Sequence, residues 1–92
     1  MLATTTAPTY AELMINQIKQ RVHMVNRQLR NEELCVYESG TQYCVIVLLN
    51  TKTRTAVATF GVNAAARRDL CLTKAFLSLV ENTRKAPMAL AA

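Results

Sequence analysis

The stretch that decides the fold runs from Leu34 to Phe60 and reads LCVYESGTQYCVIVLLNTKTRTAVATF. β-Branched and aromatic residues are abundant in it and strong helix formers are sparse, so the stretch is expected to form β-strands. Ser39-Gly40 suits a two-residue hairpin loop, and NTKT at 50–53 suits a second turn. These signals predict three antiparallel strands, at about 34–38, 41–49 and 54–60.

The two turns also predict how the strands pair. The first turn places Cys35 opposite Cys44, and the second places Val45 opposite Ala58. One face of the sheet then carries Leu34, Val36, Tyr43, Val45, Val47, Ala56, Ala58 and Phe60. This face is the better candidate for helix packing, because its alanines leave room for helix side chains. The other face carries Cys35, Tyr37, Cys44, Ile46, Leu48, Thr55, Val57 and Thr59. Two helices cannot cover both faces, so the second face is either an open partner surface or is partly covered by sheet twist and the chain ends.

A helix is expected before the strands, from Tyr10 to about Asn31. Thr9 and Glu12 have the spacing of a capping box, in which each side chain accepts a hydrogen bond from the other residue's backbone N–H. Apolar residues then recur at steps of three and four, as on one face of a helix. This stripe consists of Tyr10, Met14, Ile18, Val22, Val25 and Leu29.

A second helix is expected after the strands, from Ala64 to about Asn82. Gly61 ends the third strand in this interpretation, and Asn63 is the expected N-cap. The face predicted to meet the core carries Ala65, Leu72, Ala75, Phe76, Leu79 and Val80. Leu70 and Leu77 are then expected to point outward.

These elements predict an α+β fold in the order helix-strand-strand-strand-helix, with two helices packed on one face of a three-stranded antiparallel sheet. The 92 residues are expected to form one domain, 1–92, with flexible ends at 1–8 and 84–92. The hydrophobic fraction of 51% and the charged fraction of 18% fit a folded chain rather than a disordered one.

The charge balance indicates an anionic partner. Lysine and arginine number 11 and aspartate and glutamate number 6, which gives a net charge of +5. An excess of this size in a short chain favours nucleic acid, a nucleoprotein complex or an acidic protein surface. An ordinary basic protein remains the alternative.

The cysteines indicate a reducing compartment. Cys35, Cys44 and Cys71 are odd in number, and the first ten residues lack the basic and apolar regions of a secretion signal. All three thiols are therefore expected to be reduced, structural and buried, in a cytoplasmic protein. The longest apolar run, CVIVLL, is too short to cross a membrane, so no membrane partner is expected.

No motif predicts catalysis. The cysteines lack C-x-x-C spacing, His23 is the only histidine, and no glycine-rich phosphate loop occurs. The carboxylates are scattered along the chain without a paired pattern. We therefore expect no enzyme, no catalytic residue, no metal, no cofactor and no small-molecule substrate.

Nine residues are the candidates for binding a nucleic acid or another partner. Four of them follow helical spacing opposite the apolar stripe of the first helix, and the alternative is that this strip is merely solvated. Two lie near the start of the second helix, where backbone N–H groups favour anions. The nine are Lys19, His23, Arg27, Arg30, Lys52, Arg54, Arg67, Arg68 and Lys74.

The element order resembles that of the double-stranded-RNA-binding domain. In that family a basic cluster at the start of the last helix grips phosphates, and NAAARRDLCLTKAF at 63–76 occupies the corresponding place. Arg67 and Arg68 stand near that family's lysine-rich helix start, and the resemblance implies that they contact phosphate.

In size and style the chain also resembles small phage-encoded inhibitors of bacterial defence, including anti-CRISPR proteins. This resemblance implies a phage protein in the host cytoplasm that contacts guide RNA or an acidic subunit and so blocks target DNA binding by an RNA-guided complex. The leading expectation is a non-enzymatic protein that binds nucleic acid or a nucleoprotein complex through a basic surface. The alternatives are a homodimeric structural or adaptor protein that pairs through an open sheet face, and a double-stranded-RNA-binding module.

Overall fold

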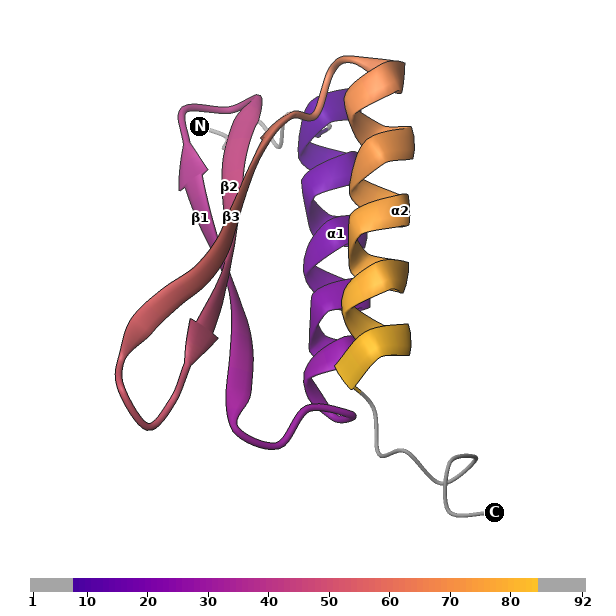
Figure 1. Cartoon of the computed structure of the whole chain (residues 1–92). Coiled ribbons are helices and arrows are strands. Elements are labelled where there is room, and N and C mark those ends of the chain that lie inside the picture. Colours follow the sequence, from indigo (N-terminus) through magenta and orange to yellow (C-terminus); the bar gives the residue numbers. More distant parts are fainter. Residues whose placement is uncertain (1–7, 85–92) are drawn as a thin grey trace, which may run out of the picture.

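The computed structural model describes residues 8–84, which form two helices and one three-stranded sheet (Figure 1). The elements in chain order are α1 (Tyr10–Asn26), β1 (Glu32–Ser39), β2 (Tyr43–Asn50), β3 (Thr55–Asn63) and α2 (Arg67–Arg84). The strands are antiparallel in the order β1-β2-β3, and the helices lie side by side on one face (Figure 1). The predicted α+β fold is confirmed. Of the predicted flexible ends, 1–7 and 85–92 lie outside the described residues, and Arg84 belongs to α2.

The start of α1 follows the predicted capping box. The backbone N–H of Thr9 donates to Glu12 Oε1 at 2.7 Å, and the N–H of Glu12 donates to Thr9 Oγ1 at 3.2 Å. One face of the helix then enters the core through Ala11, Ile15, Ile18, Val22 and Val25.

The end of α1 was predicted wrongly, because the helix stops at Asn26 rather than near Asn31. The Asn26 side chain explains the stop. Its Nδ2 donates to the carbonyl oxygen of Leu34 at 3.0 Å, and its Oδ1 accepts from the N–H of Leu34 at 2.7 Å. Because β1 is an edge strand, this amide takes the place that a neighbouring strand would fill. The chain therefore turns back at once, although Leu29 still packs against the core.

The first hairpin differs from the expected one by its loop. Three residues, 40–42, connect the strands, and Gly40 has φ 68°, a left-handed conformation that suits glycine. The register therefore pairs Cys35 with Val47, not with Cys44. An odd change in loop length turns every side chain of β2 to the other face.

The loop length decides which residues of β2 are buried. Cys44, Ile46 and Leu48 face the helices and are at most 1% exposed, whereas the predicted face placed Tyr43, Val45 and Val47 there. Gln42, the last residue of this loop, is held to the end of β3, because its carbonyl oxygen accepts from the N–H of Ala64 at 2.8 Å. The expected core-face positions on β1 and the middle of β3 are correct: Leu34 is buried, and Val36, Ala58 and Phe60 pack against the core.

The second hairpin also departs from its expected register. Asn50 pairs with Thr55 across a four-residue loop, and Val45 pairs with Gly61 rather than with Ala58. A β-bulge between Leu48 and Leu49 shifts the pairing, as bulges do when one strand carries an extra residue.

The face of α2 that meets the core was predicted correctly for Phe76 and Val80 and wrongly for the leucines. Thr73, Leu77 and Val80 are buried, while Leu72 and Leu79 are 51% and 60% exposed. Leu77 and the half-buried Leu70, expected to point outward, pack in or against the core. The helix begins at Arg67 rather than at Ala64, and Asn63 is the last residue of β3 rather than an N-cap.

Two contacts explain this orientation of α2. The ring of Phe76 stacks on Phe60 of β3 with centroids 4.9 Å apart, which fixes the side of the helix that meets the sheet. The hydroxyl of Thr73 donates to the carbonyl oxygen of Asp69 at 2.7 Å, so a polar residue can occupy the buried face without an unpaired group. Hydrophobicity alone does not reveal such a position.

Within residues 8–84, neither helix is long and apolar enough to span a membrane.

Candidate functional site

The structure separates the nine candidate residues into distinct groups. Both helices begin at one end of the molecule, beside the β1–β2 turn, and the β2–β3 turn lies at the opposite end (Figure 1). Arg67 and Arg68 are the first residues of α2 and so lie at the end where the helices begin. The remaining seven lie along the two helices or at the opposite end.

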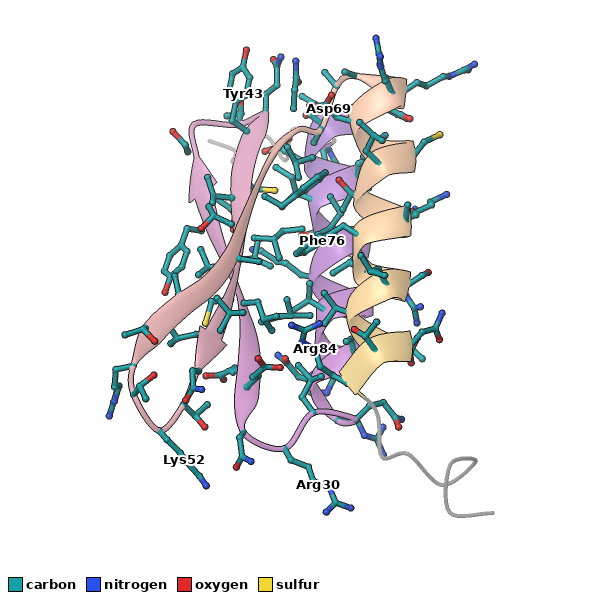
Figure 2. All side chains as sticks on the ribbon, viewed as in Figure 1. Arg30, Tyr43, Lys52, Asp69, Phe76 and Arg84 are labelled. Carbon is teal, nitrogen blue, oxygen red and sulfur yellow. The ribbon has the colours of Figure 1, made fainter. Side chains whose placement is uncertain are left out.

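Four candidates gather where α1 ends. Arg27 is the C-cap of α1 and Arg30 lies in the α1–β1 loop, while Lys52 and Arg54 belong to the β2–β3 turn. Figure 2 shows Arg30 and Lys52 at the same end of the molecule. We call these four residues the basic end. All four are exposed.

Backbone hydrogen bonds join the two loops of the basic end. The N–H of Thr51 donates to the carbonyl oxygen of Asn31 at 2.9 Å, so Arg30 and Lys52 each adjoin a residue of this bond. Asn50 Oδ1 shapes the turn by accepting from the N–H groups of residues 52 and 53, at 2.9 and 3.1 Å. Arg30 and Lys52, twenty-two positions apart in the sequence, are therefore held at the same end of the molecule.

Arg54, the last residue of the β2–β3 turn, has an unusual backbone conformation. Its φ is 62°, the left-handed region that residues other than glycine, asparagine and aspartate seldom adopt. A hydrogen bond from its N–H to the carbonyl oxygen of Asn50, at 2.8 Å, holds this conformation. The guanidinium group is thereby kept on the turn at some cost in backbone energy, a feature that is common at binding sites.

The proposed strip on α1 is broken up. Arg27 and Arg30 lie beyond the helix, and only Lys19 and His23 remain on it. Lys19 forms an ion pair with Glu38 of β1, so its charge is already engaged within the chain. Lys19 is therefore a weaker candidate than the residues of the basic end.

Most carboxylates are engaged inside the molecule. Glu38, Glu81 and Glu32 pair with Lys19, Arg21 and Arg84, respectively. Glu12 belongs to the capping box, and Asp69 accepts from the N–H of Asn63 at 2.7 Å. Only Glu33 has no such partner among residues 8–84.

The cations outnumber these engaged carboxylates. Residues 8–84 contain ten lysines and arginines, of which three are ion-paired within this part of the chain. Seven therefore remain without a carboxylate partner there, namely Arg27, Arg30, Lys52, Arg54, Arg67, Arg68 and Lys74. Every lysine and arginine among the nine candidates except Lys19 belongs to this set. Because no carboxylate partner offsets these charges, they give the surface a positive potential.

The start of α2 places two cations where a helix favours anions. Arg67 and Arg68 precede Asp69, whose carboxylate offsets them in the first turn. That carboxylate is also tied to the end of β3 through Asn63. Arg67, with Lys74 one heptad later, borders a groove between α1 and α2, whereas Arg68 does not line it.

The sheet face away from the helices carries uncharged residues at its centre. Its central positions are Cys35, Tyr37, Val45, Val47 and Thr59, which we call the open face. Tyr37 is 58% exposed, and neither helix covers this side of the sheet (Figure 1). The helices therefore leave this face uncovered, with the opposite set of β2 residues on it, and the alternative that the chain ends cover part of it lies outside the described residues.

Groups that could support metal or nucleophilic chemistry are dispersed. In the described part of the chain, no three His, Cys, Asp or Glu side chains lie close enough together to hold a metal ion. Cys44 is buried, Cys35 is partly buried and Cys71 is exposed on α2, so the expectation that all three are buried was wrong for Cys71. His23 is exposed on the surface of α1.

The three thiols are expected to react in the order of their exposure. Iodoacetamide should modify Cys71 first and Cys44 last, with Cys44 more than about tenfold slower than Cys71 in the native protein. Burial raises the pKa of the Cys44 thiol and the nearby Glu38 carboxylate adds to the rise, while Lys19 opposes it. A raised pKa leaves less thiolate at neutral pH, which slows the reaction further.

Mass spectrometry of timed samples would give the three rates, with the urea-unfolded protein as the control. Equal rates for Cys44 and Cys71 in the native protein would contradict this arrangement of the sheet.

Arg21 is a site residue that the sequence interpretation missed. It borders the groove between the helices, and its Nη2 lies 2.8 Å from Glu81 Oε1. The two residues are sixty positions apart, so no local spacing could reveal their contact.

Comparison of the chain with protein-family models, curated proteins and solved structures gave no match.

Proposed function

We propose that this chain is a non-enzymatic binding protein that engages nucleic acid or a nucleoprotein complex through its basic end. One observation carries the proposal: seven cations of the described chain have no carboxylate partner, while five of the six carboxylates are engaged internally. Four of the seven form the basic end. A surface of this kind attracts polyanions over a distance comparable with the Debye length.

The basic end suits contacts with phosphates. Its four side chains are exposed at the end of α1 and in the two neighbouring loops, where they can reach a nucleic-acid backbone without rearrangement of the sheet or the helices. No aromatic residue belongs to the basic end, so base stacking is not expected there. Phosphate contacts position a protein but do not read sequence, and binding should therefore depend little on base sequence.

The same surface is suited to inhibition of an RNA-guided complex. By contacting guide RNA or an acidic subunit, the chain would occupy the space that target DNA needs. The support for this anti-CRISPR activity is the resemblance in size and style to phage inhibitors, together with the basic end.

Two variants test the proposal. The first replaces Arg27, Arg30, Lys52 and Arg54 with glutamine, and the matched control replaces Arg67, Arg68 and Lys74. Titration of labelled duplex DNA and duplex RNA at low salt should show about a hundredfold weaker binding for the first variant and a much smaller loss for the control. Thermal unfolding should be nearly unchanged in both, because exposed substitutions rarely affect stability.

The ranking of the two variants distinguishes the candidate surfaces. Free-energy losses in proportion to the charges removed, four against three, would mean that net charge alone governs binding. A larger loss in the control would favour a double-stranded-RNA-binding module, because Arg67 and Arg68 lie at the helix start that this family uses.

The open face supports a second candidate function, that of a homodimeric structural or adaptor protein. The apolar character of Val45, Val47 and Cys35 suits face-to-face packing with the same surface of a second copy. Sedimentation velocity at low and high salt would test it, since apolar pairing persists when salt is raised. A monomer at high protein concentration in both salts would contradict it.

A further inference from the structure

A groove runs between the two helices, apart from both the basic end and the open face. Its volume is about 470 Å³, within the range of protein sites that enclose a ligand. Every residue that lines it belongs to α1 or α2, and none belongs to a strand. The groove is therefore formed by the helix layer alone, and the sheet packs on one side of that layer (Figure 1).

The floor of the groove is apolar. Ile18 and Leu77 are buried beneath it, and Met14 and Leu70 are half-buried along it. An apolar floor binds apolar groups, and the flexible thioether of Met14 can adapt to their shape. Tyr10, which is 53% exposed, stands at the end where the helices begin.

The rim of the groove is positively charged. Arg21, Arg67 and Lys74 line it, and no aspartate or glutamate does. Arg21 is held by Glu81, so Arg67 and Lys74 are the cations available to a ligand. The occupant should therefore combine an apolar side with negative charge at its edge.

The length of the groove indicates the size of the occupant. The residues from α1 extend from Tyr10 to Arg21, which corresponds to about 16 Å of helix, or three turns. A short helix of a partner protein fits this length. A nucleic-acid duplex, which is broad and presents phosphates, cannot use the apolar floor.

We propose that this groove binds an acidic amphipathic helix of a partner protein. Apolar side chains at every third or fourth position of that helix would contact Ile18, Leu70 and Leu77, which is the usual way in which a helix occupies a groove. Its carboxylates would lie beside Arg67 and Lys74. Nucleic-acid binding at the basic end does not require this site.

The test uses a synthetic acidic amphipathic peptide of about four turns, with leucine at helical spacing and glutamate at the remaining positions. Fluorescence anisotropy should show saturable binding to the full chain below about 1 mM. A peptide with the same composition but scrambled leucine positions should bind at least about tenfold more weakly, because it has no apolar side. A peptide in which lysine replaces glutamate should not bind.

Charge reversal in the protein locates the site. The R67E/K74E variant should lose at least about tenfold in affinity for the acidic peptide, since two attractive contacts become repulsive. The matched control R68E/K52E reverses two exposed cations that do not line the groove, and its affinity should fall less than about threefold. Circular dichroism would confirm that both variants are folded.

The alkylation rate of Cys71 gives an independent test of peptide binding, because Cys71 lines the groove and is exposed. Saturating peptide should slow its alkylation and leave that of Cys35, on the open face, unchanged. The proposal would be overturned by absence of saturable binding, by equal binding of the scrambled peptide, or by equal losses in the two charge-reversal variants. Protection of Cys71 by duplex DNA instead of by the peptide would assign the groove to nucleic acid.

Discussion

Replacement of Leu77 with alanine is expected to lower the free energy of unfolding by about 3 kcal/mol. The Leu77 side chain is 1% exposed and belongs to the core between the helices and the sheet. Truncation removes buried methyl groups and leaves a cavity, because packed neighbours relax only partly. Urea denaturation followed by circular dichroism would measure the loss.

Leu79 provides the matched control on the same helix. It is 60% exposed, so Leu79→Ala should change stability by less than about 0.5 kcal/mol. Sequence hydrophobicity predicts the opposite ranking, with Leu79 in the core and Leu77 on the surface. A larger loss for Leu79→Ala would therefore show that α2 is rotated about its axis relative to the structure.

Replacement of Asn26 with alanine is expected to cost about 2 kcal/mol. The side chain makes two hydrogen bonds with the backbone of Leu34, which is 3% exposed. Their removal leaves a donor and an acceptor of the edge strand without their partners, and each loss is worth about 1–1.5 kcal/mol. Alanine favours the helix slightly more than asparagine does, which offsets a few tenths of a kcal/mol.

Two further variants give this prediction its controls. Asn31→Ala removes an exposed amide that makes no side-chain hydrogen bond within the described chain, and it should be nearly neutral. Asn26→Asp keeps an acceptor for the Leu34 N–H but places a carboxylate oxygen against the Leu34 carbonyl, so it should also be destabilising. Chemical denaturation of the three variants would measure these changes in the free energy of unfolding. A neutral Asn26→Ala would mean that α1 and β1 are held together by apolar packing alone.

The order of elements could be predicted from the sequence because its signals are local. The capping box at Thr9 and the β-branched residues after Leu34 act on neighbouring residues, and both are confirmed. The faces of β2 and α2 could not be predicted in this way. The face of β2 depends on the length of the loop at residues 40–42, and that of α2 on the stacking of Phe76 against Phe60, a contact between distant parts of the chain.

The candidate site was partly predictable for the same reason. Single cations such as Arg30 and Lys52 can be identified from composition, and both are exposed. Their proximity depends on the hydrogen bond between the two loops, and the engagement of Lys19 by Glu38 depends on the contact between α1 and β1. The sequence shows which residues are charged, whereas the fold decides which of those charges are paired.

The dependence of nucleic-acid binding on salt tests the central claim most directly. If the four cations of the basic end each contact a phosphate of duplex DNA, the slope of log K against log salt should be about −3.6. The variant with glutamine at all four positions should lose most of that slope, while the Arg67, Arg68 and Lys74 control should retain it. A wild-type slope near zero, or an unchanged slope in the four-residue variant, would contradict the proposal that the basic end binds nucleic acid.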